Sequence, residues 1–168
     1  MIELTIGGLL NGDYEEPGNQ YQLYVIRESK EGTVFYVGQS KAGVVNRVLQ
    51  HLGKGQGFSG NTLITTLIHR VKPESLAWIV QLYRQDEILS ESMAAIVKGV
   101  SKGEWESLLG PSFAWFAWQE EDGQDHIVYN NLDKAEQILI EELRPCLNVT
   151  YNLRGSRLPA RYEKLLLY

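Results

Sequence analysis

Two short segments, YQLYVIRE at residues 21–28 and TVFYVG at residues 33–38, decide the fold class of this chain. Both are rich in β-branched and aromatic residues, which favour strands, and the first alternates apolar with polar side chains. Between them, Ser-Lys-Glu-Gly at residues 29–32 has the length of a hairpin loop. The sequence therefore predicts two neighbouring antiparallel strands.

The residues after this hairpin predict a helix with two notable polar side chains. Apolar residues recur at helical spacing between positions 42 and 52. This spacing leaves Arg47 and His51 together on the opposite face, one turn apart. On local grounds alone, such an arginine is a solvated charge and such a histidine a surface or core residue. A glycine-rich loop is expected to follow at residues 53–60.

Two more helices and one more strand are expected further along. Residues 61–71 predict a helix, and residues 76–83 predict a strand. Residues 133–143 predict another helix, because Asp133 followed by Glu136 has the form of a capping box and a proline comes soon afterwards. Local sequence alone would explain Glu136 as a capping residue.

The middle of the chain leaves its structure open. Residues 85–109 are mostly helical in character but contain two glycines, and FAWFAW at residues 113–118 fits a strand or a buried helical turn. The whole chain, residues 1–168, is expected to be a single domain of the α/β (α+β) class, with a small, mainly antiparallel sheet flanked by helices. Its parts would be a core at 21–83 and 126–152, an accessory insertion at 84–125 and a basic tail at 153–168.

The composition fits a globular protein of a reducing compartment. The chain has 168 residues, of which 43% are hydrophobic, and no apolar run is long enough to span a bilayer. Its single cysteine cannot form an internal disulfide, and its first residues lack the basic region of a signal peptide. We therefore expect a cytoplasmic protein without a membrane segment.

The net charge of −5 is unevenly distributed. It amounts to +1 over residues 1–73, −10 over residues 74–142 and +4 over residues 143–168. A nucleic-acid-binding protein normally carries an excess of Lys and Arg. Both ends of this chain could together form a basic binding face, with the acidic middle as a solvated flank.

Five residues supply the groups that phosphodiester hydrolysis needs. A water must lose a proton, the charge that grows on the phosphate must be neutralised, and the leaving oxygen needs help. Tyrosine and histidine can move protons, arginine matches a phosphate, and a carboxylate can hold a divalent metal. The five are Tyr24, Tyr36, Arg47, His51 and Glu136.

The two strands resemble the opening motifs of the GIY-YIG endonuclease family. That family has Gly-Ile-Tyr on one strand and Tyr-Ile-Gly on the next, and this chain has Gln-Leu-Tyr at 22–24 and Tyr-Val-Gly at 36–38. The chain departs from the family at Gln22, where the family has Gly. It also departs at Gln39, where some members have Lys, although Lys41 lies close by in the sequence.

The helices continue this resemblance. The family's helix after the strands carries Arg and, in many members, His four positions later, like Arg47 and His51. Its later helix carries a Glu and is followed by Pro and then Asn, like Glu136, Pro145 and Asn148. The resemblance covers residues in both halves of the chain, and it implies the nuclease fold of that family with an inserted region.

The resemblance also implies a role for each residue. Glu136 would be the ligand of a divalent metal, Mg²⁺ or Mn²⁺, and Arg47 would brace the scissile phosphate. Tyr24 or Tyr36 would accept a proton from the attacking water or orient it, and His51 could accept or relay that proton instead. The family therefore implies a metal-dependent endonuclease that hydrolyses phosphodiester bonds in DNA.

The expected partner is DNA, in double-stranded form. Phosphate contacts are expected from Lys41, Lys54, Asn148, Arg154 and Arg157, and Asn148 would also tie the last segment to the site. The protein could be a restriction-type, mobile-element or repair nuclease, and it could act as a homodimer. Two alternatives stay open, a non-catalytic nucleic-acid-binding module that keeps the nuclease fold and a protein-interaction domain that uses the acidic region 84–125.

Overall fold

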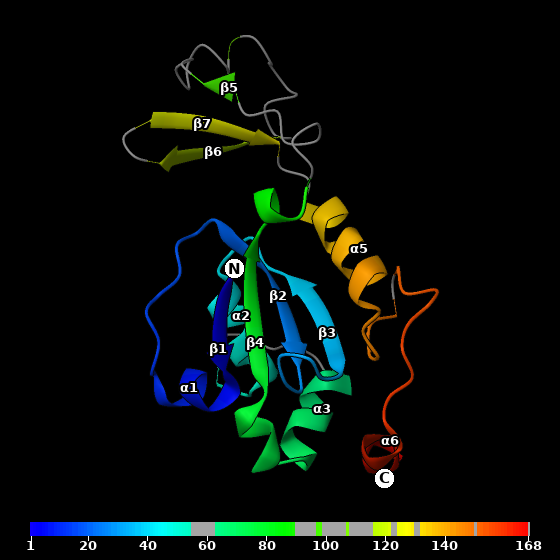
Figure 1. Ribbon diagram of the computed structural model, residues 1–168. Helices are drawn as coiled ribbons and strands as arrows, with labels where there is room; N and C mark the ends of the chain where they lie inside the picture. Colours follow the sequence, from blue (N-terminus) through cyan, green and yellow to red (C-terminus); the bar gives the residue numbers. More distant parts are fainter. Residues whose placement is uncertain are drawn as a thin grey trace.

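The computed structural model of the chain is built around a four-stranded antiparallel sheet in the order β1-β4-β2-β3 (Figure 1). It describes residues 1–54, 63–89, 97–98, 107, 116–121, 124–129, 132–149 and 151–167. The strands of this sheet are β1 (Ile2–Thr5), β2 (Tyr21–Arg27), β3 (Val34–Gln39) and β4 (Ile79–Arg84). The expected α+β class with a small antiparallel sheet is therefore confirmed.

The predicted hairpin forms the β2–β3 half of this sheet. Leu23 pairs with Gln39 and Ile26 pairs with Tyr36, in antiparallel register. The ladder then skips Phe35, which makes a bulge in β3. Strict alternation would send Phe35 and Tyr36 to opposite faces of the sheet, whereas the bulge lets both pack against the same core.

The remaining two strands differ from the sequence prediction. The strand expected at 76–83 begins later, because residues Glu74–Ala77 form the 3₁₀ helix η1 before β4 starts at Ile79. Strand β1 was not predicted, and it pairs with β4 at one edge of the sheet. It is short because Thr5 ends it by capping helix α1 (Ile6–Asn11), where the Thr5 hydroxyl accepts from the backbone N–H of Gly8.

Helices cover both faces of the sheet (Figure 1). Alternate residues of β2 point to opposite faces, with Tyr24 and Ile26 on one face and Leu23 and Val25 on the other. The face of Tyr24 packs against α1, α2, α3 and α6, and the face of Leu23 packs against α5. These further helices are α2 (Val44–His51), α3 (Leu63–Arg70), α5 (Leu132–Leu143) and α6 (Ala160–Leu166).

A segment after α5 covers the open edge of β3. The backbone N–H of Cys146 donates to the carbonyl of Val34 at 3.0 Å, and that of Leu147 donates to the carbonyl of Phe35 at 2.9 Å. The side chain of Asn148 continues this pairing, since it accepts from Val37 N at 2.9 Å and donates to Val37 O at 2.8 Å. The edge strand thus has its backbone groups paired on both sides.

A second, three-stranded sheet has the order β5-β7-β6 and lies beyond one end of β4 in Figure 1. Its strands are β5 (Val97–Lys98), β6 (Phe116–Glu121) and β7 (Gln124–Tyr129). The accessory insertion was expected to end at residue 125 and the core to resume at residue 126, but strand β7 runs across this boundary. The described part of FAWFAW is strand, and its residues 113–115 lie outside the described residues, as does the expected glycine-rich loop from residue 55 onward.

The region expected to be mostly helical, residues 85–109, is mixed where the structure describes it, with residue 107 helical. It begins with the 3₁₀ helix η2 (Gln85–Glu87) and contains β5. None of the described helices combines the length and the apolar character that crossing a membrane would need.

Candidate active site

Tyr24 and His51 form a hydrogen-bonded pair inside the protein. The Tyr24 hydroxyl lies 2.8 Å from His51 Nε2, and both residues are buried. The other ring nitrogen, Nδ1, lies 3.3 Å from the hydroxyl of Thr65 in α3. Both ring nitrogens therefore have partners, which offsets the loss of their contact with water.

The position of His51 corrects the sequence prediction. His51 continues the buried row that Val44 and Val48 form on α2, so the prediction that it lies on the face opposite the apolar residues is wrong. The physical reason is that α3 and β2 both supply a hydrogen-bond partner there, which makes burial of the imidazole possible. Arg47, three residues after Val44, is only partly buried.

Tyr36 stands beside this pair. Its ring centre lies 6.1 Å from that of Tyr24 and 5.5 Å from that of His51. Unlike Tyr24, it is partly exposed, and it lines a groove at the surface. The two predicted tyrosines are therefore neighbours, but only Tyr36 borders the groove.

The charge of Arg47 acts on all three of these side chains. Its guanidinium lowers the pKa of both tyrosines, but burial has the larger effect and raises the pKa of each above its usual value. For His51, burial and the Arg47 charge act in the same direction and lower its pKa to about 4. At neutral pH, His51 is therefore an uncharged base and both tyrosines keep their protons.

Glu136 reaches the same groove from α5. Gln39, at the end of β3, donates one amide to Glu136 Oε2 at 2.9 Å and to Asp133 Oδ1 at 2.6 Å. Burial raises the pKa of Glu136, as does the nearby Asp133 carboxylate, while the hydrogen bond from Gln39 opposes both effects. The Glu136 charge in turn raises the pKa of Tyr24 and Tyr36, so it is felt at both rings.

This arrangement replaces the capping box that the sequence predicted. Helix α5 begins at Leu132, so Asp133 lies inside its first turn and does not precede the helix. The carboxylates of Asp133 and Glu136 both accept from Gln39, a residue 94 and 97 positions away in the sequence. Their spacing of three residues places both on one side of the helix.

The sequence reasoning did not assign Gln39 and Asp133 to the site. Two signals could have found them, because Gln39 directly follows the Tyr-Val-Gly motif and Asp133 precedes Glu136 by one helical turn.

The groove itself runs along the β3 edge of the sheet. It has a volume of about 410 Å³, and its walls include Tyr36, Glu136 and Asn148. Leu63, the first residue of α3, and Tyr151 border it further out. The groove therefore contains two of the predicted catalytic side chains, Tyr36 and Glu136.

Glu136, which lines the groove, and its neighbour Asp133 suit a magnesium ion. Within the described ranges, no three His, Cys, Asp or Glu side chains converge as a complete protein cage would require. Magnesium commonly uses one or two carboxylates together with water and substrate phosphate. Glu136 and Asp133 share one amide donor, so their oxygens converge, and the donor set fits this type of site.

The residues expected to contact phosphate have varied surroundings. The Asn148 amide is used by the backbone of Val37. Lys54 donates to the carbonyl of Leu10 at 3.2 Å, and Arg157 pairs with Glu163 at 3.6 Å. Lys41 is exposed between β3 and α2, and Arg154 is exposed beside a second pocket.

Comparison of the chain with protein-family models, curated proteins and solved structures finds no match. Its function must therefore be inferred from the geometry of the groove and from the sequence motifs.

Proposed function

We propose that this protein is a metal-dependent endonuclease that hydrolyses phosphodiester bonds in DNA. The observation that carries this proposal is the convergence of Tyr24, Tyr36, Arg47, His51 and Glu136, which come from β2, β3, α2 and α5. These five residues come from distant parts of the sequence, and the GIY-YIG resemblance singles out the same five. A purely structural explanation would account for each residue alone but not for the clustering of Tyr24, Arg47 and His51 beside a groove that Tyr36 and Glu136 line.

Arg47 is the residue best suited to the phosphate. Its guanidinium is partly exposed, and its charge is felt by Tyr24, Tyr36 and His51. A fixed positive charge stabilises the transition state when negative charge grows on the phosphate oxygens. Gln50 accepts a hydrogen bond from Arg47 at 2.9 Å, which orients the guanidinium on the helix.

The tyrosines and His51 divide the handling of the water and its proton. Tyr36 borders the groove, so we assign it to orienting the attacking water. Its raised pKa argues against a phenolate base. His51 is uncharged at neutral pH and can accept the released proton at Nε2, through the hydroxyl of Tyr24.

Glu136, with Asp133 beside it, would hold the divalent cation. When bound, Mg²⁺ or Mn²⁺ would stabilise negative charge on the phosphate and lower the pKa of water. Gln39 donates to both carboxylates and so holds them together.

The test is cleavage of supercoiled, linear and single-stranded DNA with Mg²⁺ or Mn²⁺. We expect the wild type to cut only with metal, and we expect Glu136→Gln and Arg47→Ala to lose about a hundredfold or more in rate. Glu142→Gln is the matched control, because Glu142 is an exposed carboxylate on the same helix. Equal cutting by the wild type and both site variants would overturn the proposal. DNA binding without cutting on any substrate would favour the non-catalytic binding module.

A further inference from the structure

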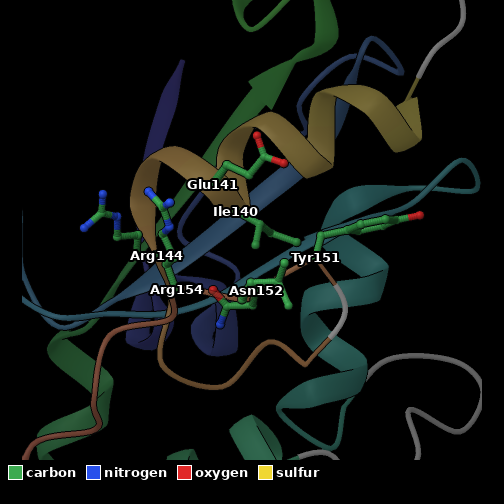
Figure 2. A pocket seen from close by; sticks show the side chains of 7 residues that line it. Ile140, Glu141, Arg144, Tyr151, Asn152 and Arg154 are labelled. Carbon is green, nitrogen blue, oxygen red and sulfur yellow. The ribbon is translucent and has the colours of Figure 1, made fainter.

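A second pocket lies next to the groove, and Figure 2 shows the residues that line this second pocket. Ile140 and Tyr151 line both cavities, so the two form adjacent compartments. The second pocket has a volume of about 280 Å³, which is near the lower limit for small-ligand sites. It can therefore take one small group but not a duplex.

Two arginines stand at one end of this pocket and the ring of Tyr151 at the other, and the Glu141 carboxylate also lines it, so its charged residues carry a net charge of +1. Figure 2 shows Arg144 and Arg154 side by side, with Tyr151 on the opposite side of Ile140. No salt bridge to either arginine is found within the described part of the chain. Two neighbouring guanidinium groups repel each other, and an anion between them relieves that repulsion.

The loop that carries these residues is held in a defined shape. Arg144 and Tyr151 both have positive φ, at 49° and 59°, which is uncommon for residues other than glycine. Asn152 fixes the loop by donating to the carbonyls of Pro145 at 2.6 Å and Asn148 at 2.8 Å. The positive φ of Arg144 ends helix α5, where its N–H donates to the carbonyl of Ile140 at 2.9 Å, and Asn152 holds the segment that follows.

The loop also exposes apolar side chains beside the arginines. Leu153 is fully exposed, Val149 is 89% exposed and Tyr151 is 50% exposed. Aromatic side chains next to arginines form the usual combination that binds single-stranded nucleic acid, where bases stack on rings and phosphates meet positive charge. A base inside a duplex offers no free face for such stacking.

From this geometry we infer that the pocket binds one unpaired nucleotide next to the scissile phosphate, with Tyr151 against the base and Arg144 and Arg154 on its phosphate. This inference rests on the proposed nuclease function, because it takes the adjoining groove as the place of the scissile phosphate. The substrate class is then a duplex with an unpaired segment, such as an overhang or a flap. A fully paired duplex fills only the groove.

The experiment is fluorescence anisotropy in EDTA, so that binding is measured without cleavage. The probes are a labelled blunt duplex and the same duplex with a single-stranded overhang. We expect the wild type to bind the overhang duplex about fivefold or more tightly than the blunt duplex. A factor of this size is the lower end of what the stacking of one base on an aromatic side chain contributes to binding. Tyr151→Leu should remove this preference, whereas Tyr151→Phe, which keeps the ring, should retain it.

The contact between the arginines and the phosphate is tested separately, by the salt dependence of binding. Arg154→Ala should reduce the preference, and it should lower the slope of log affinity against log salt by about one for the overhang duplex. Lys30→Ala is the matched charge control, because Lys30 is exposed on the β2–β3 turn and lines neither cavity. Equal wild-type affinity for the two probes, or a preference unchanged in both Tyr151→Leu and Arg154→Ala, would overturn the inference.

The inference and the proposed function can fail separately. Metal-dependent cutting of DNA without a preference for the overhang would contradict the pocket and leave the nuclease proposal standing. Preference for the overhang without any cutting would support the pocket and contradict the nuclease.

Discussion

The ring of Tyr24 lies directly over Gly38, its partner across the β2–β3 ladder. A Cβ at position 38 would overlap the phenol ring and its hydroxyl. This hydroxyl is the one that bonds to His51. The glycine of the Tyr-Val-Gly motif therefore makes room for the aromatic ring of the opposite strand, and it does so with an ordinary extended backbone.

Replacement of Gly38 by alanine should disturb Tyr24. We expect Gly38→Ala to reduce the free energy of unfolding by about 1–3 kcal/mol, the usual cost of overpacking a filled core. Urea denaturation of the wild type and the variant measures this change. The cleavage rate should fall as well, because the Tyr24 hydroxyl must move away from His51.

A double variant tests whether the Tyr24 ring is the cause of this loss of stability. In a Tyr24→Leu background the bulky ring is absent, so Gly38→Ala should cost clearly less than it does in the wild type. An equal cost in both backgrounds would mean that Gly38 is needed for a reason other than Tyr24.

The buried His51 should make stability depend on pH. Its pKa is about 4 in the folded protein and about 6.5 when unfolded. The unfolded chain therefore binds more protons between these values, and the free energy of unfolding falls as pH decreases through this range. We expect a loss of about 2 kcal/mol between pH 7 and pH 5 from this group.

Urea denaturation at the two pH values checks this prediction. Other groups titrate in the same range, so the informative quantity is the difference between the wild type and His51→Gln, which cannot gain a proton. The variant should lose less stability than the wild type on acidification. A parallel loss in both proteins would contradict the assignment to His51.

Asn148 should stabilise the β3 edge through its two bonds to Val37. In Asn148→Ala, the N–H and carbonyl of Val37 lose their partners, at a cost of about 1–3 kcal/mol for each group that stays buried. Asn148→Asp keeps the acceptor and loses the donor, so its cost should be smaller. Hydrogen exchange of the Val37 amide is the direct measurement, and its protection should fall in Asn148→Ala but persist in Asn148→Asp.

Gln39 should affect the Mg²⁺ concentration that half-maximal cleavage needs. Gln39→Met removes the amide that favours the charged form of Glu136, so the pKa of Glu136 should rise further. A metal ligand must be deprotonated, so the variant needs more Mg²⁺ for half-maximal cleavage at pH 6. The difference from the wild type should shrink at pH 8, because a higher pH favours the ionised form of Glu136 in both proteins. A difference that is the same at both pH values would show that Gln39 acts only through structure.

The sequence predicted those parts of the fold that leave a local pattern. The β2–β3 hairpin and helix α2 follow from the spacing of apolar residues, and helices α3 and α5 follow from capping residues and the prolines after them. Strand β1 escaped prediction because four residues are too few for a clear alternation, and its pairing with β4 links positions 2 and 82. The bulge at Phe35 escaped for a similar reason, since it depends on the register with β2.

The candidate site shows the same difference between local patterns, which the sequence reveals, and long-range contacts, which it does not. The motif spacing singled out Tyr24, Tyr36 and Glu136, and the structure places Tyr36 and Glu136 in one groove with Tyr24 buried beside Tyr36. The bonds from Gln39 to Asp133 and Glu136 join residues almost a hundred positions apart and leave no periodic trace in the sequence. The burial of His51 likewise depends on a helix that follows it, whose Thr65 supplies the second partner.

The closure of the β3 edge by residues 146–148 has a consequence for the order of folding. The sheet can form from residues 2–84, but the groove exists only when contacts with sequence separations of 97 and 111 are made. Closing so long a loop is entropically costly, so we expect the groove to be completed after the sheet. Partial opening of α5 and its following segment would then dismantle the groove before global unfolding, so the proposed cleavage activity should be lost at a lower denaturant concentration than the four-stranded sheet.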